Sequence, residues 1–258
     1  MANQLISNRA VRLFIILAGF FITNALVAEF IGVKIFSLEE TMGWQPFEWS
    51  LFGITGTLQL TAGVLLWPVV FIMTDVINEY YGQKGVRLLS YLTAGLIAYG
   101  FVMIFGAIEL APADWWIGIG SEMGVDNMQN AFAQVFGQSL WIIIASLVAF
   151  LVGQILDAFV FYRIRIVTGN KRIWLRATVS TAVSQFIDSY VVLYIAFVIG
   201  PQQWSMNQFF AVGTVNYGYK LSVAILLIPL LYVFHYLIDN YLGHDKANAL
   251  RREATHNA

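Results

Sequence analysis

The sequence predicts an all-α membrane protein, a single bundle of six transmembrane helices with both chain ends in the cytoplasm. Three observations predict this fold. Of the 258 residues, 59% are apolar and only 11% are charged, whereas a soluble domain carries about 25% charged residues. Six stretches are apolar over roughly 20 residues each, the length that crosses about 30 Å of hydrocarbon. Among the connections between these stretches, lysine and arginine occur only in alternate ones.

The six stretches follow one another with short connections, so the whole chain, 1–258, is predicted to be one domain. They span about residues 13–36, 60–81, 88–110, 140–161, 177–199 and 210–239. The second and last contain Pro68 and Pro229, each of which invites a bend. The stretches lack the alternation of barrel strands and are about twice as long, which favours helices. The longest connection, 112–138, is expected to form a short surface helix with its tryptophans at the membrane interface.

Charges in the connections predict the orientation, because basic loops stay in the cytoplasm. Basic residues precede the first stretch, join the second to the third and the fourth to the fifth, and fill a cytoplasmic tail at 242–258. They are Arg9, Arg12, Lys84, Arg87, Arg163, Arg165, Lys171, Arg172, Arg176, Lys246, Arg251 and Arg252. The remaining connections carry acids or no charge. The first stretch also fits a cleaved signal peptide, but five further stretches favour a multi-pass protein of the cytoplasmic (inner) membrane.

Polar side chains inside the stretches are the candidate functional groups, because each charge costs roughly 2.5–3.5 kcal/mol at a helix centre. Asp75 and Glu79 are four residues apart on one helical face, where like charges repel unless a cation, a proton or a ligand lies between them. The candidate substrate-binding residues are Asn24, Phe71, Asp75, Asn78, Glu79, Gln154, Asp157, Gln185, Asp188, Asn216 and Lys220. The alternative is that these groups only pair with one another and hold the bundle together.

Missing motifs argue against several other functions. The chain has no cysteine and no glycine-rich phosphate loop, so it cannot hydrolyse ATP by that route. Neither a zinc-protease helix nor a serine nucleophile elbow is present, and we therefore expect no enzyme activity. The three histidines lack the close spacing of a zinc site. No cofactor, no metal and no nucleic-acid partner is predicted.

Three segments resemble the queuosine precursor transporters, also called the vitamin uptake transporter-like family. Residues 68–82 match the pattern Pro-x-x-Phe-x-x-x-Asp-x-x-x-Glu-x-Tyr-Gly, residues 153–157 read Gly-Gln-Ile-Leu-Asp, and the third segment is 180–188. Lys34 and Lys220, together with Asn24 above, also fall at family positions. The fold that the resemblance implies is similar to that of the substrate-binding subunits of vitamin transporters.

The resemblance implies import of 7-deazaguanine precursors of the tRNA nucleoside queuosine, namely preQ0, preQ1 or queuine, for salvage. A carboxylate can accept both donors of a guanine-like edge, and Asp188 and Glu79 are the first candidates for that role. Phe71 could stack on the ring, while Lys220, Asn78 or Gln185 could donate to its carbonyl. The implied partners are the deazapurine and the lipid bilayer.

The energy source stays open. A secondary transporter driven by protons or sodium, and a substrate-binding subunit with a separate ATP-driven energising module, both fit the sequence. A non-transporting structural membrane protein is the alternative from another class. Whether the chain forms a homodimer is also open.

Overall fold

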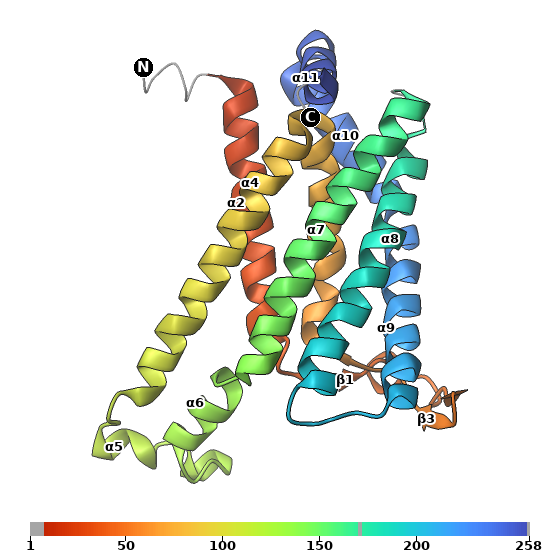
Figure 1. Cartoon of the computed structure of the whole chain (residues 1–258). Helices are drawn as coiled ribbons and strands as arrows, with labels where there is room; N and C mark the ends of the chain where they lie inside the picture. Colours follow the sequence, from red (N-terminus) through yellow and green to blue (C-terminus); the bar gives the residue numbers. More distant parts are fainter. Residues whose placement is uncertain (1–7, 170–171, 257–258) are drawn as a thin grey trace.

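The computed structural model describes residues 8–169 and 172–256, which form a bundle of long helices (Figure 1). The long helices are α2 (Arg9–Ile31), α4 (Trp67–Glu109), α7 (Leu140–Thr168), α8 (Ile173–Leu193), which continues into the π-helical η3 (Tyr194–Ile199), α9 (Met206–Leu226), α10 (Ile228–Leu242) and α11 (His244–His256). The start of α2 and helix α11 lie at one end of the bundle, called here the terminal end (Figure 1). The opposite end, called the loop end, carries the strands and the short helices α5 and α6.

Helix α4 is two helical arms joined by a sharp bend at Gly82. A straight helix of its 43 residues would be roughly 65 Å long at 1.5 Å per residue, about twice the hydrocarbon thickness. Gly82 has φ 70° and ψ −177°, a conformation that favours glycine. In Figure 1 the orange first arm and the yellow second arm meet at the terminal end and both run towards the loop end. The arms correspond to the predicted stretches 60–81 and 88–110.

Five segments of the described residues are long and apolar enough to cross a membrane. They are Arg9–Ile31, Ala62–Glu109, Met128–Thr168, Ile173–Ile199 and Met206–Leu226. The second contains the Gly82 bend, and the count of six crossings stays a prediction. Large apolar side chains face outward along these segments, with Ile16 61% and Val102 66% exposed. Lipid is the solvent that can cover such a surface, because water penalises exposed apolar area.

Two predicted helix ends are wrong at the loop end. Helix α2 ends at Ile31 rather than at residue 36, and the next residues form strand β1 (Ile35–Ser37), which pairs antiparallel with β4 (Gln59–Thr61). The chain then enters a 3₁₀ turn, η1 (Ala62–Leu65). This turn crosses the end of α2 so closely that a Cβ on Gly63 would lie 2.5 Å from a backbone oxygen. The pairing is a tertiary contact that hydropathy does not predict.

The predicted bend at Pro68 is also wrong, since α4 begins at Trp67 and Pro68 lies in its first turn. Proline is favoured there because the missing N–H would have no partner within the helix. The predicted bend at Pro229 is confirmed: α9 ends at Leu226 and α10 begins at Ile228, so that Pro229 lies in the first turn of α10. The single predicted stretch 210–239 is therefore two helices.

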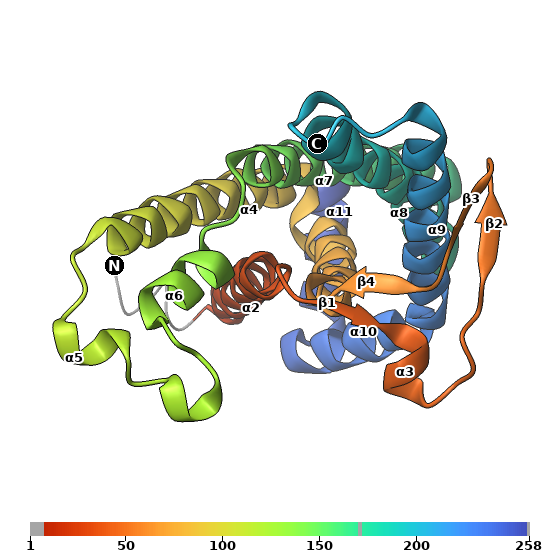
Figure 2. The ribbon, with the colours of Figure 1, turned by 90° about the horizontal axis from the view of Figure 1, so that it is seen from below.

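Short elements cap the loop end in two groups (Figure 2). Beside α9 lie α3 (Leu38–Met42) and the hairpin of β2 (Trp49–Leu51) and β3 (Ile54–Gly56), so the all-α prediction is correct only for the long segments. Beside α2 and α4 lie α5 (Asp114–Ile117), η2 (Ser121–Met123) and α6 (Met128–Phe136), which confirm helical structure within 112–138. In the first group Glu39 accepts a hydrogen bond from the backbone N–H of Leu58 at 2.7 Å, which lowers the pKa of its carboxyl.

The predicted tail is a packed helix rather than a loose extension. Helix α11 lies against the bend of α4, and Ala247 and Ala254 on it are buried. A Cβ on Gly82 would lie 2.9 Å from the carbonyl oxygen of Ala254, so the two backbones are in close contact. Lys171, which we counted among the basic residues, and 257–258 of the tail lie outside the described residues.

Candidate functional site

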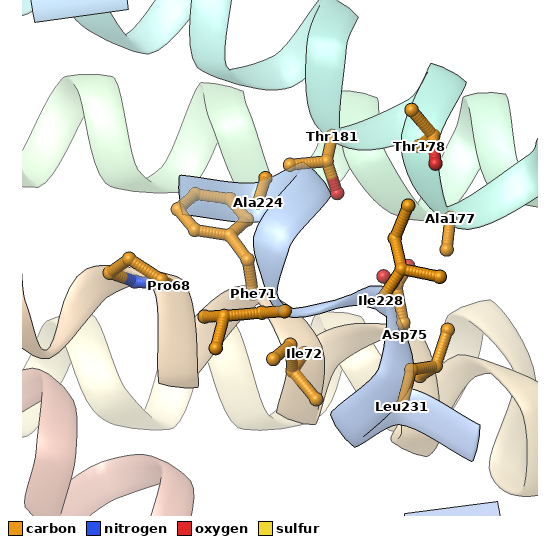
Figure 3. Close-up of a pocket in the computed structure, with 11 residues that line it drawn as sticks. Pro68, Phe71, Ile72, Asp75, Ala177, Thr178, Thr181, Ala224, Ile228 and Leu231 are labelled. Carbon is orange, nitrogen blue, oxygen red and sulfur yellow. The ribbon is translucent and has the colours of Figure 1, made fainter. Parts of the chain in front are cut away.

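A pocket in the bundle is lined by the first arm of α4, by α8 and by the bend between α9 and α10. Its cavity volume is about 20 Å³, far below the roughly 300–1,000 Å³ of small-molecule sites, so a ligand the size of a nucleobase fits only when the walls of the pocket move apart. Phe71 and Asp75, one helical turn apart on α4, extend towards Thr181 of α8 and Leu231 of α10 (Figure 3). This cavity is called the Asp75 pocket.

Asp75 is the only ionisable residue among those that line the pocket. Its side chain is buried, and within the described residues its Oδ1 has no hydrogen-bond partner. The same holds for the hydroxyl of Thr178 across the pocket. Buried polar groups nearly always have a partner, because leaving one unpaired costs about 1–3 kcal/mol. The pocket therefore presents an acceptor and a hydroxyl that a polar ligand could satisfy, beside the aromatic ring of Phe71.

Polar residues next to the pocket join α4, α7 and α8. Thr74 donates to Gln154 Oε1 at 2.7 Å, and Ser184 donates to Asp157 Oδ1 at 3.1 Å. Asn78 donates to a backbone carbonyl of α7 at 3.2 Å. These predicted site residues thus bind other helices rather than line the pocket. They are not fully satisfied: within the described part of the chain the second oxygen of Asp157 and the amide nitrogens of Gln154 and Gln185 lack partners.

Glu79 is held by three arginines at the terminal end. Arg176 of α8 donates to Glu79 Oε2 at 2.6 Å, Arg165 of α7 lies 3.7 Å from the same oxygen, and Arg251 of α11 lies 3.6 Å from Oε1. Glu79, Arg165 and Arg176 are each at most 2% exposed. The pairing offsets part of the cost of burying these charges, which would be several kcal/mol per isolated ion.

Sequence reasoning missed these arginines, because it assigned them to basic connections and to the tail. Helices α7 and α8 extend further than predicted, to Thr168 and from Ile173, and so bring Arg165 and Arg176 into the bundle. One signal was available. Glu79 was predicted near the cytoplasmic end of its stretch, the same level as the arginine-rich connection.

The remaining predicted residues lie elsewhere. Asp188 of α8 forms an ion pair with Lys220 of α9 at 2.6 Å, with both side chains about one-sixth exposed. Asn216 lies one turn before Lys220 and is half-buried, and Asn24 of α2 donates to the carbonyl of Phe20 on its own helix. None of these four lines the Asp75 pocket. Within 8–169 and 172–256 no three His, Asp or Glu residues converge as metal ligands.

Comparison with known protein families identifies what kind of protein carries this pocket. Residues 61–234 match the sequence model of the family described as "Putative vitamin uptake transporter". The chain belongs to this family. The matched region contains both arms of α4, helices α7 to α9 and the start of α10, and therefore every residue that lines the Asp75 pocket.

Curated relatives of this vitamin uptake transporter family member carry a more specific name. The chain is 32% identical over 193 residues, 74% of its length and 76% of the relative's, to the "Probable queuosine precursor transporter" of Bacillus subtilis. It is 26% identical to the "Queuosine precursor transporter" of Escherichia coli, covering 74% and 80% of the two chains. A "Probable queuosine precursor transporter" of Haemophilus influenzae is 26% identical over 65% and 64%. No solved structure matches the chain significantly. This family member is a multi-pass membrane protein of a transporter family, not an enzyme.

Proposed function

We propose that this protein imports 7-deazaguanine precursors of queuosine and that the Asp75 pocket binds them. The names of its relatives and the family match support the transport of queuosine precursors. The single observation that carries the site is that Asp75, the one ionisable residue lining the pocket, has a carboxyl oxygen without a hydrogen-bond partner in the described part of the chain.

The chemistry of a 7-deazaguanine fits this pocket. Its pyrimidine edge presents two parallel N–H donors, which one carboxylate accepts in a bidentate arrangement. The flat ring can stack on Phe71, and the hydroxyls of Thr178 and Thr181 can reach substituents. Of the eleven predicted site residues, we assign direct contact to Asp75 and Phe71. Glu79, Asp157, Asp188 and Lys220 act through the helix pairings in which the structure places them.

Replacing Asp75 by Asn tests the assignment. The asparagine amide has the same shape as the Asp75 carboxylate, but it has one acceptor oxygen instead of two. Its NH₂ group would face the N–H donors of the deazaguanine. A site built around hydrogen bonds discriminates by orders of magnitude when a buried partner is mismatched, so we expect uptake of labelled 7-aminomethyl-7-deazaguanine to fall at least ~100-fold. The measurement is uptake by cells that lack their own transporter.

Asp114→Asn is the matched control, because this carboxylate lies in the exposed connection at the loop end. Its uptake should equal that of the unmodified protein. Membrane yield and a single symmetric elution peak in detergent would show that Asp75→Asn folds. Normal uptake by a folded Asp75→Asn protein would remove Asp75 from the substrate site.

A further inference from the structure

A second pocket lies at the terminal end, directly beside the Glu79 ion pairs. Its cavity volume is about 170 Å³. Glu79 of α4, Arg176 of α8, His235 of α10 and Arg251 and Asn248 of α11 line it. It is therefore rich in hydrogen-bond donors, whereas the Asp75 pocket offers a free acceptor. It is called here the terminal pocket.

The two pockets share their walls. Helices α4, α8 and α10 line both. The contributing residues are one helical turn apart on α4, Asp75 and Glu79, and adjacent on the other two helices, Ala177 and Arg176 on α8 and 231 and 232 on α10. Residues four apart in a helix are separated by about 6 Å along the axis. The pockets are thus stacked along one groove between the same three helices.

Glu79 and Arg176 are the terminal-pocket residues nearest in the chain to Asp75 and Ala177 of the Asp75 pocket, and they form an ion pair with each other. Its atoms approach to 2.6 Å, and both side chains are almost fully buried. The Arg176 guanidinium is held further by the carbonyl of Gly169 at 2.7 Å and lies over the ring of Phe161. A charge-assisted hydrogen bond in such surroundings is strong and has a defined geometry.

Helix α11 closes the same region from outside. Arg251 donates to both carboxylate oxygens of Asp239 at 2.7 and 2.8 Å and to the hydroxyl of Tyr80 at 2.7 Å. Its backbone carbonyl accepts from Arg165 at 2.6 Å. One residue of α11 therefore bridges α4, α7 and α10 beside the ion pair. Moving α11 would break all of these contacts together.

We propose that the terminal pocket is the second half of the translocation path, and that the Glu79–Arg176 pair, held by Arg251, is the gate between the halves. This inference rests on the proposed function. A heterocycle whose N–H edge leaves Asp75 would next meet the hydrogen-bond donors that line the terminal pocket. These donors match the acceptor atoms on the carbonyl side of the heterocycle. To open the gate, Glu79 and Arg176 must separate and each must find another hydrogen-bond partner. The substrate itself can supply these partners.

Cysteine accessibility tests the gate without using substrate, because the chain has no native cysteine. Thr181→Cys places a thiol in the Asp75 pocket, where Thr181 is 5% exposed. The probe is the membrane-impermeant anion sulfonatoethyl methanethiosulfonate, added in parallel to intact cells and to inverted membrane vesicles. The measured quantity is the labelling rate of the thiol from each face.

Adding Glu79→Gln to the Thr181→Cys protein removes the negative charge of the ion pair. We then expect the labelling rate of the thiol to rise at least tenfold from the membrane face that carries the terminal end, with no rise from the other face. Arg251→Gln is a second variant with a milder change, since this side chain is 16% exposed, and should give a smaller rise in the same direction. Glu253→Gln is the matched control on the exposed side of α11 and should leave the rate unchanged.

Unchanged rates in both folded variants, or equal rises from both faces, would overturn the gate. The result is independent of the proposed substrate. Lost uptake in Asp75→Asn with unchanged labelling would retain the substrate site and reject the gate. The opposite pattern would retain the gate in a transporter whose substrate binds elsewhere.

Discussion

Asp75 and Asp188 are both acids within apolar helices, but their surroundings differ. Asp188 lies 2.6 Å from the ammonium of Lys220, so its charge is compensated within the protein. Asp75 lines a pocket, and its Oδ1 has no hydrogen-bond partner within the described residues. An acid that already has a cation contributes chiefly to the packing of its helices, whereas an acid with a free acceptor can gain a partner when a ligand binds.

A double-mutant cycle on Asp188 and Lys220 tests this distinction. We expect Asp188→Ala and Lys220→Ala each to lower the melting temperature, because each leaves one charge unpaired. The double variant should lose less than the sum, with a coupling of about 0.5–3 kcal/mol, and should recover uptake that either single variant loses. The measurements are melting in detergent and uptake in cells.

Additive losses of stability, together with a double variant that remains inactive, would contradict the structural role. They would return Asp188 and Lys220 to the substrate site that the sequence suggested for them.

The sequence predicts which residues carry the unusual chemistry better than it predicts their partners. Burial of Asp75, Glu79 and Asp157 followed from the hydropathy of the stretches around them. Their partners did not, because Arg165 and Arg176 lie where the sequence changes from apolar to basic. The helix extensions that bury them, to Thr168 in α7 and back to Ile173 in α8, leave no periodic signal. The pairing depends on which faces of α7 and α8 meet α4, which is a tertiary property.

The bend in α4 is the element on which the terminal end depends. Gly82 combines φ 70° with the close approach of the α11 backbone. Hydropathy predicted a helix on each side of it, but the local sequence did not indicate that the turn would be this short or that α11 would pack on it. The pairing of β1 with β4 was missed for a similar reason, since it joins segments more than 20 residues apart.

Replacing Gly82 by Ala should loosen α11. A Cβ at this position would meet the carbonyl of Ala254 at 2.9 Å, and a positive φ is unfavourable for alanine by roughly 1 kcal/mol or more. We expect a lower melting temperature and faster cleavage of α11 by trypsin, whose sites include Arg251 and Arg252. Limited proteolysis followed by mass spectrometry measures this.

Gly106→Ala is the matched control in the same helix, because nothing lies within 4 Å of its added Cβ. Alanine should there be neutral or stabilising by up to about 1 kcal/mol. Equal proteolysis of the two variants would show that α11 is held without the Gly82 contact.

At the scale of the whole molecule, the two ends of the bundle differ. Buried ion pairs lie at the terminal end, and strands and short helices cover the loop end. Helix α11 lies at the terminal end (Figure 1) and carries Arg251, which lies 3.6 Å from Glu79. Asp75 of the Asp75 pocket is one helical turn before Glu79 on α4, in the direction of the loop end. If basic residues remain in the cytoplasm, the terminal pocket opens there. The direction from the loop end through the Asp75 pocket to the terminal pocket would then be import.

Single cysteines in the cysteine-free chain test this orientation. Met123, 83% exposed in the connection at the loop end, and Ala249, exposed on α11, can each be replaced by Cys without changing charge. An impermeant maleimide should label Met123→Cys in intact cells and Ala249→Cys only after permeabilisation, because the positive-inside rule places α11 in the cytoplasm. Labelling of Ala249→Cys in intact cells would reverse the bundle in the membrane, and the terminal pocket would then be the entrance to the path rather than its exit.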